Sequence, residues 1–171
     1  FGMNVAMNKS GYKSFDEVLN DGKKPLSPEE FEEVAEETGA LILDTRTAAE
    51  FHKGFVPNSI NIGLKGDFAP WVGAMIADVK QPILLITDAG TEEEAITRLA
   101  RVGFDKVIGF LDGGFENWKN SGKKIDEINR ISPEEFAEKF KKNSKNRSSY
   151  AFVCIKSAFF RNLCISLMML A

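Results

Sequence analysis

A strand, loop and helix pattern between Ile83 and Ala95 constrains the fold of this chain more than any other feature. The four residues 83–86 are all apolar, a short loop that contains Gly90 follows, and three glutamates at 92–94 open a helical stretch. A short, fully apolar strand is typical of a parallel sheet that is covered on both faces. In α/β proteins the loop that follows such a strand commonly holds an anion or a nucleophile. We therefore expect the functional site at this loop.

The same order of strand and helix recurs along the chain. We expect buried strands at 40–43, 83–86 and 107–111, a short strand at 60–62, and helices at 28–38, 67–78, 91–102 and around Phe115 and Trp118. Alternation of this kind predicts an α/β fold of three layers, in which a mainly parallel central sheet has helices on both faces. Ligands of such sheets bind at the carboxyl ends of the strands.

One helix start occurs twice in the chain. Residues 26–31 read Leu-Ser-Pro-Glu-Glu-Phe, and residues 131–136 read Ile-Ser-Pro-Glu-Glu-Phe. In each copy the serine is an N-cap, the proline suits the first helical position, and the second glutamate completes a capping box. Two interpretations stay open: convergence of two good helix starts, or the beginning of a second copy of the same domain that is then cut short.

Composition excludes several classes of function. The net charge of −3 gives no basic field for nucleic acid, and the single histidine, His52, excludes a multi-histidine metal site. Cys154 and Cys164 form no disulfide framework, so a reducing cytoplasm is expected. Two charges interrupt the apolar segment 151–171, and we expect no membrane span there. The sequence predicts neither a metal nor a bound cofactor.

Several motifs in a fixed order carry a resemblance to a known family. They are Leu-Asp-Thr-Arg at 43–46, Glu-Phe at 50–51 with the segment 54–62, the helix positions 95 and 99 with Gly-Phe at 103–104, Leu-Asp-Gly-Gly-Phe at 111–115, Trp118 and Gly122. With these motifs the chain resembles a rhodanese-homology domain. The resemblance implies a sulfurtransferase-type fold. It divides the chain into a connector at 1–23, the domain at 24–125, and at 126–171 the start of a truncated second repeat with an apolar tail.

The resemblance also implies an active-site loop that has lost its chemistry. Active members carry a loop of the form Cys-Xaa-Xaa-Gly-Xaa-Arg after the central strand, whose amides stabilise a thiolate or a persulfide. Counted back from Gly90, the cysteine position is Thr87 and the arginine position is Glu92. The whole vestigial loop is Thr87, Asp88, Ala89, Gly90, Thr91 and Glu92. Sulfur transfer needs a thiolate, and threonine with no adjacent base is not a substitute. The resemblance therefore implies no catalytic residue in this segment.

The carboxylates of the loop have two interpretations. Acidic side chains in the first turn of a helix meet the positive end of its dipole and contribute about 0.3–1 kcal/mol each. Alternatively, Asp88 or Glu92 folds into the empty amide cradle and acts as a built-in anion. A role for Asp88 as a replacement nucleophile is disfavoured, because the loop holds no lysine and no set of metal ligands.

Three residues near the first strand are expected to lie at the edge of the site and to organise it. Asp44 can accept hydrogen bonds from the turn that follows it. Arg46 is predicted to pair with Glu50, one helical turn further along the chain. All three are expected to have structural roles.

The function expected from the sequence is that of a catalytically inactive rhodanese-like module, a scaffold, docking or regulatory domain of a larger protein. Residues 2–12 are similar to the connector of proteins that fuse a metallo-β-lactamase-fold domain to tandem rhodanese domains. This resemblance implies a parent in sulfur metabolism, a metallo-hydrolase or a persulfide dioxygenase. The alternatives are a weak sulfurtransferase and a regulatory domain that binds a small anion. The expected partners are other domains of the parent chain, a protein partner or a second copy, and neither nucleic acid nor membrane.

Overall fold

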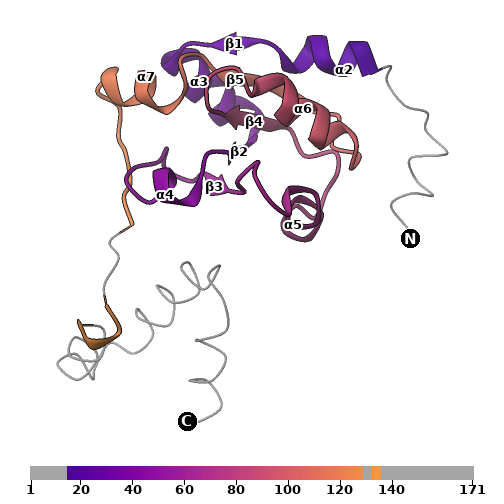
Figure 1. The fold of residues 1–171 in the computed structure, drawn as a ribbon. Helices are drawn as coiled ribbons and strands as arrows, with labels where there is room; N and C mark the ends of the chain where they lie inside the picture. The colour runs from indigo at the N-terminus through magenta and orange to yellow at the C-terminus, as the bar shows by residue number, and fades with distance from the viewer. Residues whose placement is uncertain (1–14, 129–131, 136–171) are drawn as a thin grey trace. The chain divides into compact units, whose positions relative to one another are not determined.

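The structure is a computed structural model that describes residues 15–128 and 132–135. The chain divides into two compact units, the first ending at Ile128 and the second beginning at Asn129. Each unit is described by itself. The first unit contains every strand named below, and Figure 1 shows its layers.

A five-stranded parallel sheet forms the centre of the first unit (Figure 1). Its strands are β1 (Pro25–Leu26), β2 (Leu41–Asp44), β3 (Ile60–Asn61), β4 (Ile83–Ile86) and β5 (Val107–Leu111). They lie in the order β1-β5-β4-β2-β3, and each neighbouring pair is parallel. The central strand β4 is buried along its whole length, as an apolar strand covered on both faces must be. The predicted α/β fold with a parallel sheet is confirmed.

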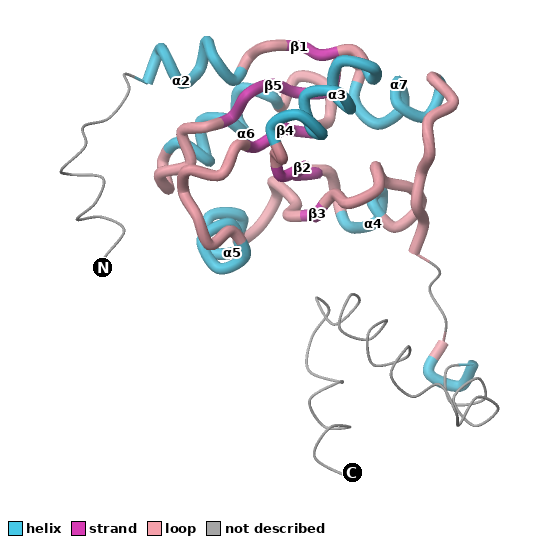
Figure 2. Tube along the Cα trace, turned by 180° about the vertical axis from the view of Figure 1, so that it is seen from behind, coloured by secondary structure: helices cyan, strands magenta, loops and turns pink. Residues whose placement is uncertain are grey.

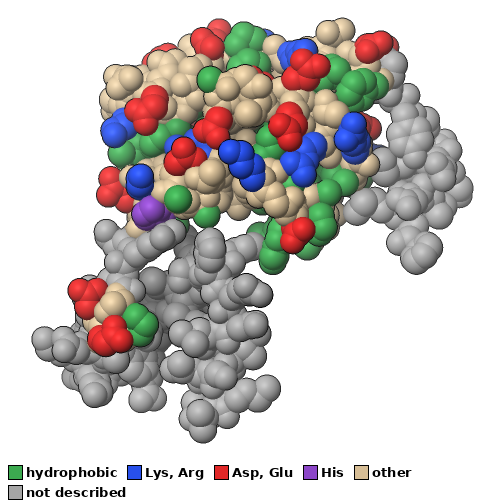
Figure 3. All heavy atoms as spheres, in the orientation of Figure 1, with side chains coloured by type: hydrophobic (Ala, Val, Ile, Leu, Met, Phe, Trp, Pro, Cys, Tyr) green, Lys and Arg blue, Asp and Glu red, His purple; other side chains and the backbone are tan. Residues whose placement is uncertain are grey.

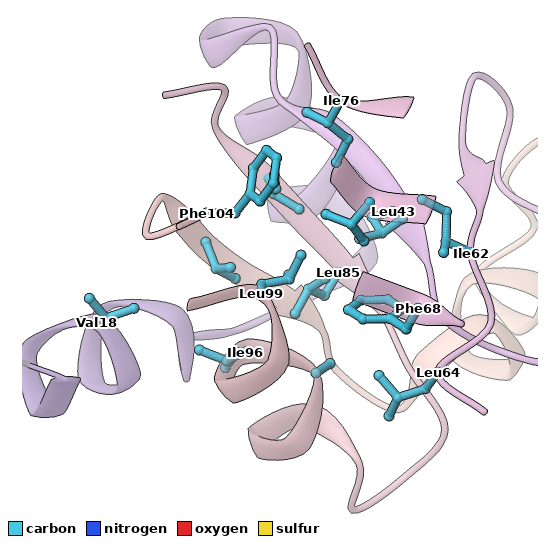
Figure 4. Packing of buried hydrophobic residues seen from close by; sticks show 14 residues of the cluster. Val18, Leu43, Ile62, Leu64, Phe68, Ile76, Leu85, Ile96, Leu99 and Phe104 are labelled. Carbon is cyan, nitrogen blue, oxygen red and sulfur yellow. The ribbon is translucent and has the colours of Figure 1, made fainter. Parts of the chain in front are cut away.

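One face of the sheet is covered by three helices: α2 (Phe15–Gly22), α5 (Phe68–Met75) and α6 (Glu92–Ala100). Figure 4 shows how their apolar side chains meet those of the sheet. Val18 of α2, Phe68 of α5 and Ile96 of α6 pack with Leu43 and Leu85 of the central strands in one hydrophobic cluster. The inward positions Ala95, Ile96 and Leu99 follow the 3.6-residue period that predicted α6.

The opposite face is covered by α3 (Pro28–Thr38) and α7 (Gly114–Asn120), which are seen in Figure 2. Phe31 of α3 and Trp118 of α7 meet edge to face, with ring centroids 6.1 Å apart. Both rings pack with Leu84 and Ile86 of β4. Successive residues of β4 therefore point into the hydrophobic clusters on opposite faces of the sheet. A short helix, α4 (Ala48–Phe51), follows β2.

The cap predicted for α3 is present in full. The Ser27 side chain accepts from the Glu30 backbone N–H at 3.3 Å, and the Glu30 carboxylate accepts from the Ser27 backbone N–H at 2.9 Å. Pro28 occupies the start of the helix, and Gly39 ends it in the left-handed conformation, with φ of 61°. This local chemistry fixes where the chain enters the layer above β5.

Two segments of the first unit add to what the sequence predicts. The short helix that the sequence favours at 14–19 is present as α2, and its Val18 is 2% exposed, so the described part of the predicted connector, residues 15–23, packs into the core. Trp71 and Met75 belong to the apolar pattern that predicted the helix at 67–78, yet they are 47% and 39% exposed. They lie on the outer side of the helix, where Figure 3 shows apolar side chains over α5. Phe68 and Val72 occupy the side of α5 that faces the core, because a helix of eight residues turns only one narrow row of side chains toward the sheet.

The second unit repeats the local start of α3 in its described residues. The Ser132 side chain accepts from the Glu135 backbone N–H at 3.1 Å, and the Glu135 carboxylate accepts from the Ser132 backbone N–H at 3.1 Å. Residues 132–135 are exposed, whereas Pro28 in the first copy is buried. The other residues of the predicted second repeat, and the predicted apolar tail at 151–171, lie outside the described residues.

Candidate functional site

The predicted site lies at the carboxyl ends of β2, β4 and β5. The 87–92 loop joins β4 to α6, Asp44 ends β2, and the glycines Gly113 and Gly114 join β5 to α7. Asp44 and Ile86 are register partners in the sheet, so the segments that follow them start side by side. The fold therefore brings the loop and the Asp44–Arg46 segment to the same sheet edge, as expected for parallel strands.

The 87–92 loop is a tight turn closed by its own hydrogen bonds. The Thr91 backbone N–H and the Thr91 hydroxyl both donate to the Asp88 carbonyl, at 3.1 and 2.8 Å. Gly90 has a φ of 83°, in the left-handed region that favours glycine. The Gly90 N–H donates to the Glu92 carboxylate at 3.0 Å. A carboxylate of the loop thus occupies one of the amides that could otherwise hold an external anion.

Thr87 is the most buried residue of the loop, at 2% exposure. No hydrogen bond among the described residues involves its hydroxyl. The backbone near it is crowded, because a Cβ placed on Gly114 would lie 2.9 Å from the Thr87 carbonyl oxygen. Gly114 also has a φ of 61°, so both space and backbone conformation require glycine at this contact. The loop and the start of α7 are therefore held against each other.

Asp44 and Arg46 form a buried ion pair beside the loop. The Arg46 Nη2 and the Asp44 Oδ2 are 2.6 Å apart, and the Arg46 Nε lies 3.1 Å from both carboxylate oxygens. The guanidinium lies over the Phe115 ring, 4.2 Å from its centroid, and also donates to the Gly54 carbonyl. Burial raises the pKa of Asp44, and the hydrogen bonds and charge of Arg46 oppose that rise. The charge of Asp88 adds to it, which places the Asp88 carboxylate within electrostatic reach of the pair.

The partner predicted for Arg46 is wrong, and Asp44 accepts a hydrogen bond from the Arg46 backbone N–H in the turn that follows it, at 3.0 Å. Arg46 pairs with Asp44 rather than with Glu50. The Glu50 carboxylate instead accepts from the Thr47 hydroxyl at 2.6 Å and from the Thr47 backbone N–H at 3.1 Å. These two bonds lower the pKa of Glu50. The i,i+4 rule failed because Arg46 precedes the helix α4 that Thr47 caps, so its side chain does not lie on the helix surface.

Asn61 is a site residue that the sequence analysis missed. Its side-chain amide donates to the Asp44 carbonyl at 3.0 Å and to the Arg46 carbonyl at 2.9 Å. Asn61 therefore fixes the turn that carries the ion pair. A polar side chain inside the otherwise apolar run at 60–62 was the available signal.

The other carboxylates near the loop have cationic partners. Glu93 pairs with Lys23, with Nζ and Oε2 2.7 Å apart, and Glu94 lies 3.4 Å from Arg98. Arg98 also donates to the Leu64 carbonyl and lies 5.4 Å from the Phe68 ring centroid. Glu93 therefore connects α6 to the segment that follows α2, whereas Glu94 pairs with Arg98 within α6. The structure supports helix electrostatics for them and the built-in anion for Glu92.

Neither a cysteine nor a cluster of metal ligands lies at this edge among the described residues. Both cysteines of the chain lie outside the described residues. Among residues 15–128 and 132–135, no group of three or more histidine, cysteine, aspartate and glutamate side chains is placed to hold a metal ion. No helix in the same part of the chain is long and apolar enough to cross a membrane.

The sheet and its edge define the class of protein: an α/β domain of three layers with a candidate site after the central parallel strand. Residues 27–121, more than half of the chain, match the rhodanese-like domain. The chain belongs to the rhodanese-like domain family.

Known proteins that resemble the chain agree with this assignment. It is 29% identical over 97 residues to the thiosulfate sulfurtransferase GlpE of Pseudomonas savastanoi, which covers 56% of this chain and 87% of that protein. An uncharacterized protein of Buchnera aphidicola is 30% identical over 81 residues, or 47% of this chain; the chain thus spans about half of that relative, 54%. The rhodanese-like domain of Alr3790 from Anabaena has the same fold, with a TM-score of 0.53 at 17% identity over 64% of this chain and 92% of that domain.

Proposed function

We propose that this segment is a catalytically silent rhodanese-like module, which serves as a scaffold, docking or regulatory domain of a larger protein. The observation that carries the proposal is the residue at the start of the 87–92 loop. In place of a thiol, this position holds the hydroxyl of Thr87, which is 2% exposed and has no hydrogen-bonded base among the described residues. A threonine hydroxyl without a base is neither a sulfur carrier nor an activated nucleophile.

The state of the loop amides supports the same function. The Gly90 N–H is already bonded to the Glu92 carboxylate, and the Thr91 N–H is bonded to the Asp88 carbonyl. An anionic sulfur donor would have to displace Glu92 and approach the Asp88 carboxylate. Both requirements disfavour the donor that a sulfurtransferase uses.

The experiment that tests the proposal is a measurement of intact mass. The full chain is incubated with thiosulfate, desalted and weighed, and any sulfur adduct is located by peptide mapping. The proposal expects no sulfur on residues 15–128, because they contain no cysteine. A stable adduct within that range would refute it. An adduct on Cys154 or Cys164 that turns over with cyanide would move the chemistry to the C-terminal segment.

A weak sulfurtransferase is the second candidate, because curated relatives are named thiosulfate sulfurtransferases. A small-anion-binding regulatory domain is another form of the proposed module, and the Glu92–Gly90 bond argues against it. The larger protein is proposed to act in sulfur metabolism or as a metallo-β-lactamase-fold hydrolase or persulfide dioxygenase. The proposed partners are the other domains of that protein, a protein partner or a second copy, in the cytoplasm.

A further inference from the structure

We propose that residues 126–128 form a releasable strap, which holds the Asp44–Arg46 pair in place while it is closed and loosens the pair when it opens. The inference rests on the proposed function, because it names the part of the regulatory module that moves. In the open state the strap leaves the segment 52–55, and the Gly54 carbonyl is no longer fixed against the Arg46 guanidinium.

Three backbone hydrogen bonds attach the strap to the segment 52–55. The Phe55 N–H donates to the Asp126 carbonyl at 2.9 Å, and the Asp126 N–H donates to the Phe55 carbonyl at 3.0 Å. The Ile128 N–H donates to the His52 carbonyl at 3.0 Å. Phe55 and Asp126 form an isolated antiparallel bridge outside the five-stranded sheet. Figures 1 and 2 both show the chain running from α7 past α4 to this bridge.

The chain just before the strap is anchored by side chains as well. The Lys123 Nζ lies 2.5 Å from the Glu32 Oε2 of α3. The Trp118 Nε1 donates to the Lys124 carbonyl at 3.0 Å, and Ile125 packs against the hydrophobic cluster under α3 and α7. No side chain of the strap itself belongs to either hydrophobic cluster. The strap can therefore open while α7 stays packed on the sheet.

His52 adds an unfavourable term to the closed state. Among the described residues, its Nδ1 is the one side-chain polar atom that is fully buried and has no hydrogen-bond partner. The same residue supplies the carbonyl that holds the end of the strap. A buried polar atom without a partner is less stable than the same atom in contact with water. An opening that admits water at His52 therefore recovers part of the free energy that is lost with the three backbone bonds.

The segment 52–55 connects the strap to the edge of the candidate site. The Arg46 Nη2 donates to the Gly54 carbonyl at 3.1 Å and to the Asp44 carboxylate at 2.6 Å. Gly54 directly precedes Phe55, whose N–H and carbonyl both bond to the strap. When the strap opens, the acceptor carbonyl of Gly54 is free to move, and the guanidinium loses one of its fixed partners.

The strap is also the last segment of the first unit. This unit ends at Ile128, and the second unit begins at Asn129. A pull on the chain that follows Ile128 therefore acts first on the three hydrogen bonds of the strap. The closed and open states give the module a way to transmit such a pull to the Asp44–Arg46 pair.

Native-state amide hydrogen exchange of the full chain, followed by NMR, tests the inference. The strap amides are those of Phe55, Asp126 and Ile128, and the reference is the Thr45 N–H, which donates to the Ile86 carbonyl inside the sheet. We expect the three strap amides to open together, with protection at least about tenfold below that of Thr45. Equal protection at all four amides would mean that the strap opens only when the whole unit unfolds, and would overturn the inference.

Two variants of the full chain test the coupling to the ion pair. Ile128→Pro removes one of the three N–H donors, whereas Glu127→Ala changes an exposed side chain and leaves the three strap bonds in place. We expect Ile128→Pro to speed exchange of the Phe55 amide and the Arg46 Nε–H roughly threefold or more, the size expected when a hydrogen bond is weakened. The Thr45 amide should be unchanged in both variants, and Glu127→Ala should alter none of these signals.

Two results would contradict the coupling. Faster exchange at Phe55 with an unchanged Arg46 Nε–H would show that the strap does not hold the ion pair. Faster exchange at Thr45 by the same factor would show that Ile128→Pro destabilises the whole unit, so the strap would be an ordinary part of the fold. Neither measurement involves sulfur chemistry, so this inference and the proposed function can fail separately.

Discussion

At the scale of single residues, the Asp44–Arg46 pair holds the candidate site in place. Both side chains are buried, and the pair connects β2 to Gly54 and to Phe115 of α7. A buried ion pair stabilises a fold mainly through what happens when one partner is lost, because the remaining charge then has no compensation. Burial raises the pKa of Asp44 and so disfavours its charged form. Arg46 is the group that compensates this charge.

Replacement of Arg46 by methionine should therefore lower the free energy of unfolding by about 3–5 kcal/mol. Urea unfolding followed by circular dichroism measures this change. Arg101→Met removes an exposed arginine near the end of α6 and should stay within about 0.5 kcal/mol of the parent. Equal losses in the two variants would show that the buried pair has no special role.

Glu50 gives a prediction about pH. Its pKa is lowered by the hydroxyl and the N–H of Thr47, so the folded state favours the ionised form. The resulting stabilisation is present above the ordinary glutamate pKa and is lost as the pH falls through the lowered value. Glu50→Gln should cost less than about 1 kcal/mol at neutral pH, because the group is exposed. The difference between the two proteins should vanish in acid, and a difference that grows in acid would contradict this account.

At the scale of elements, the twin capping boxes provide a matched comparison. Ser27 starts a helix whose Phe31 is fully buried, whereas the described residues around Ser132 are exposed. Ser27→Ala should lower the free energy of unfolding of the first unit by about 1 kcal/mol. Ser132→Ala removes the same local contacts in the second unit and should leave that unfolding unchanged. A loss in both variants would mean that the second copy supports the first unit.

The contact between the 87–92 loop and α7 gives a second prediction at this scale. Gly114→Ala would place a Cβ 2.9 Å from the Thr87 carbonyl oxygen at a positive φ, and should cost roughly 1–3 kcal/mol. Gly73→Ala, inside helix α5 with no atom within 4 Å, should instead stabilise by up to about 1 kcal/mol. Thermal unfolding of the two variants measures both changes in stability. A Gly114→Ala variant that is as stable as the parent protein would show that the 87–92 loop can move away from α7 at no cost in stability.

The elements predictable from the sequence are those set by local chemistry. The cap at Ser27, the apolar strand 83–86 and the inward stripe of α6 follow from side-chain type and spacing, and the structure has all three. Other features depend on tertiary neighbours. Nothing local indicated that Arg46 would turn back onto Asp44, that Asn61 would fix that turn, or that Trp71 would lie outside. The 87–92 loop was predictable in part. Its carboxylates are evident from the sequence, whereas the hydrogen bond from the Gly90 N–H to the Glu92 carboxylate depends on the folded conformation of the loop.

At the scale of the whole molecule, the chain has the fold of the rhodanese-like domain family, and the proposed function concerns the loop after its central strand. The first unit has the parallel sheet, the covering helices and the loop after the central strand. Figure 3 shows acidic and basic side chains interspersed over the face that it presents. Folds host many functions, and the residues of the site decide among them. Under the proposed function, Thr87 and the carboxylates of the 87–92 loop serve binding rather than sulfur transfer.

The central claim is that the rhodanese-like unit does not transfer sulfur, and the most direct test is turnover. The purified full chain is mixed with thiosulfate and cyanide, and thiocyanate is measured beside a variant with Cys154→Ser and Cys164→Ser. The account predicts thiocyanate at the level of the enzyme-free reaction for both proteins. Turnover that survives the loss of both cysteines would contradict it, because the reaction would then have to run through the 87–92 loop.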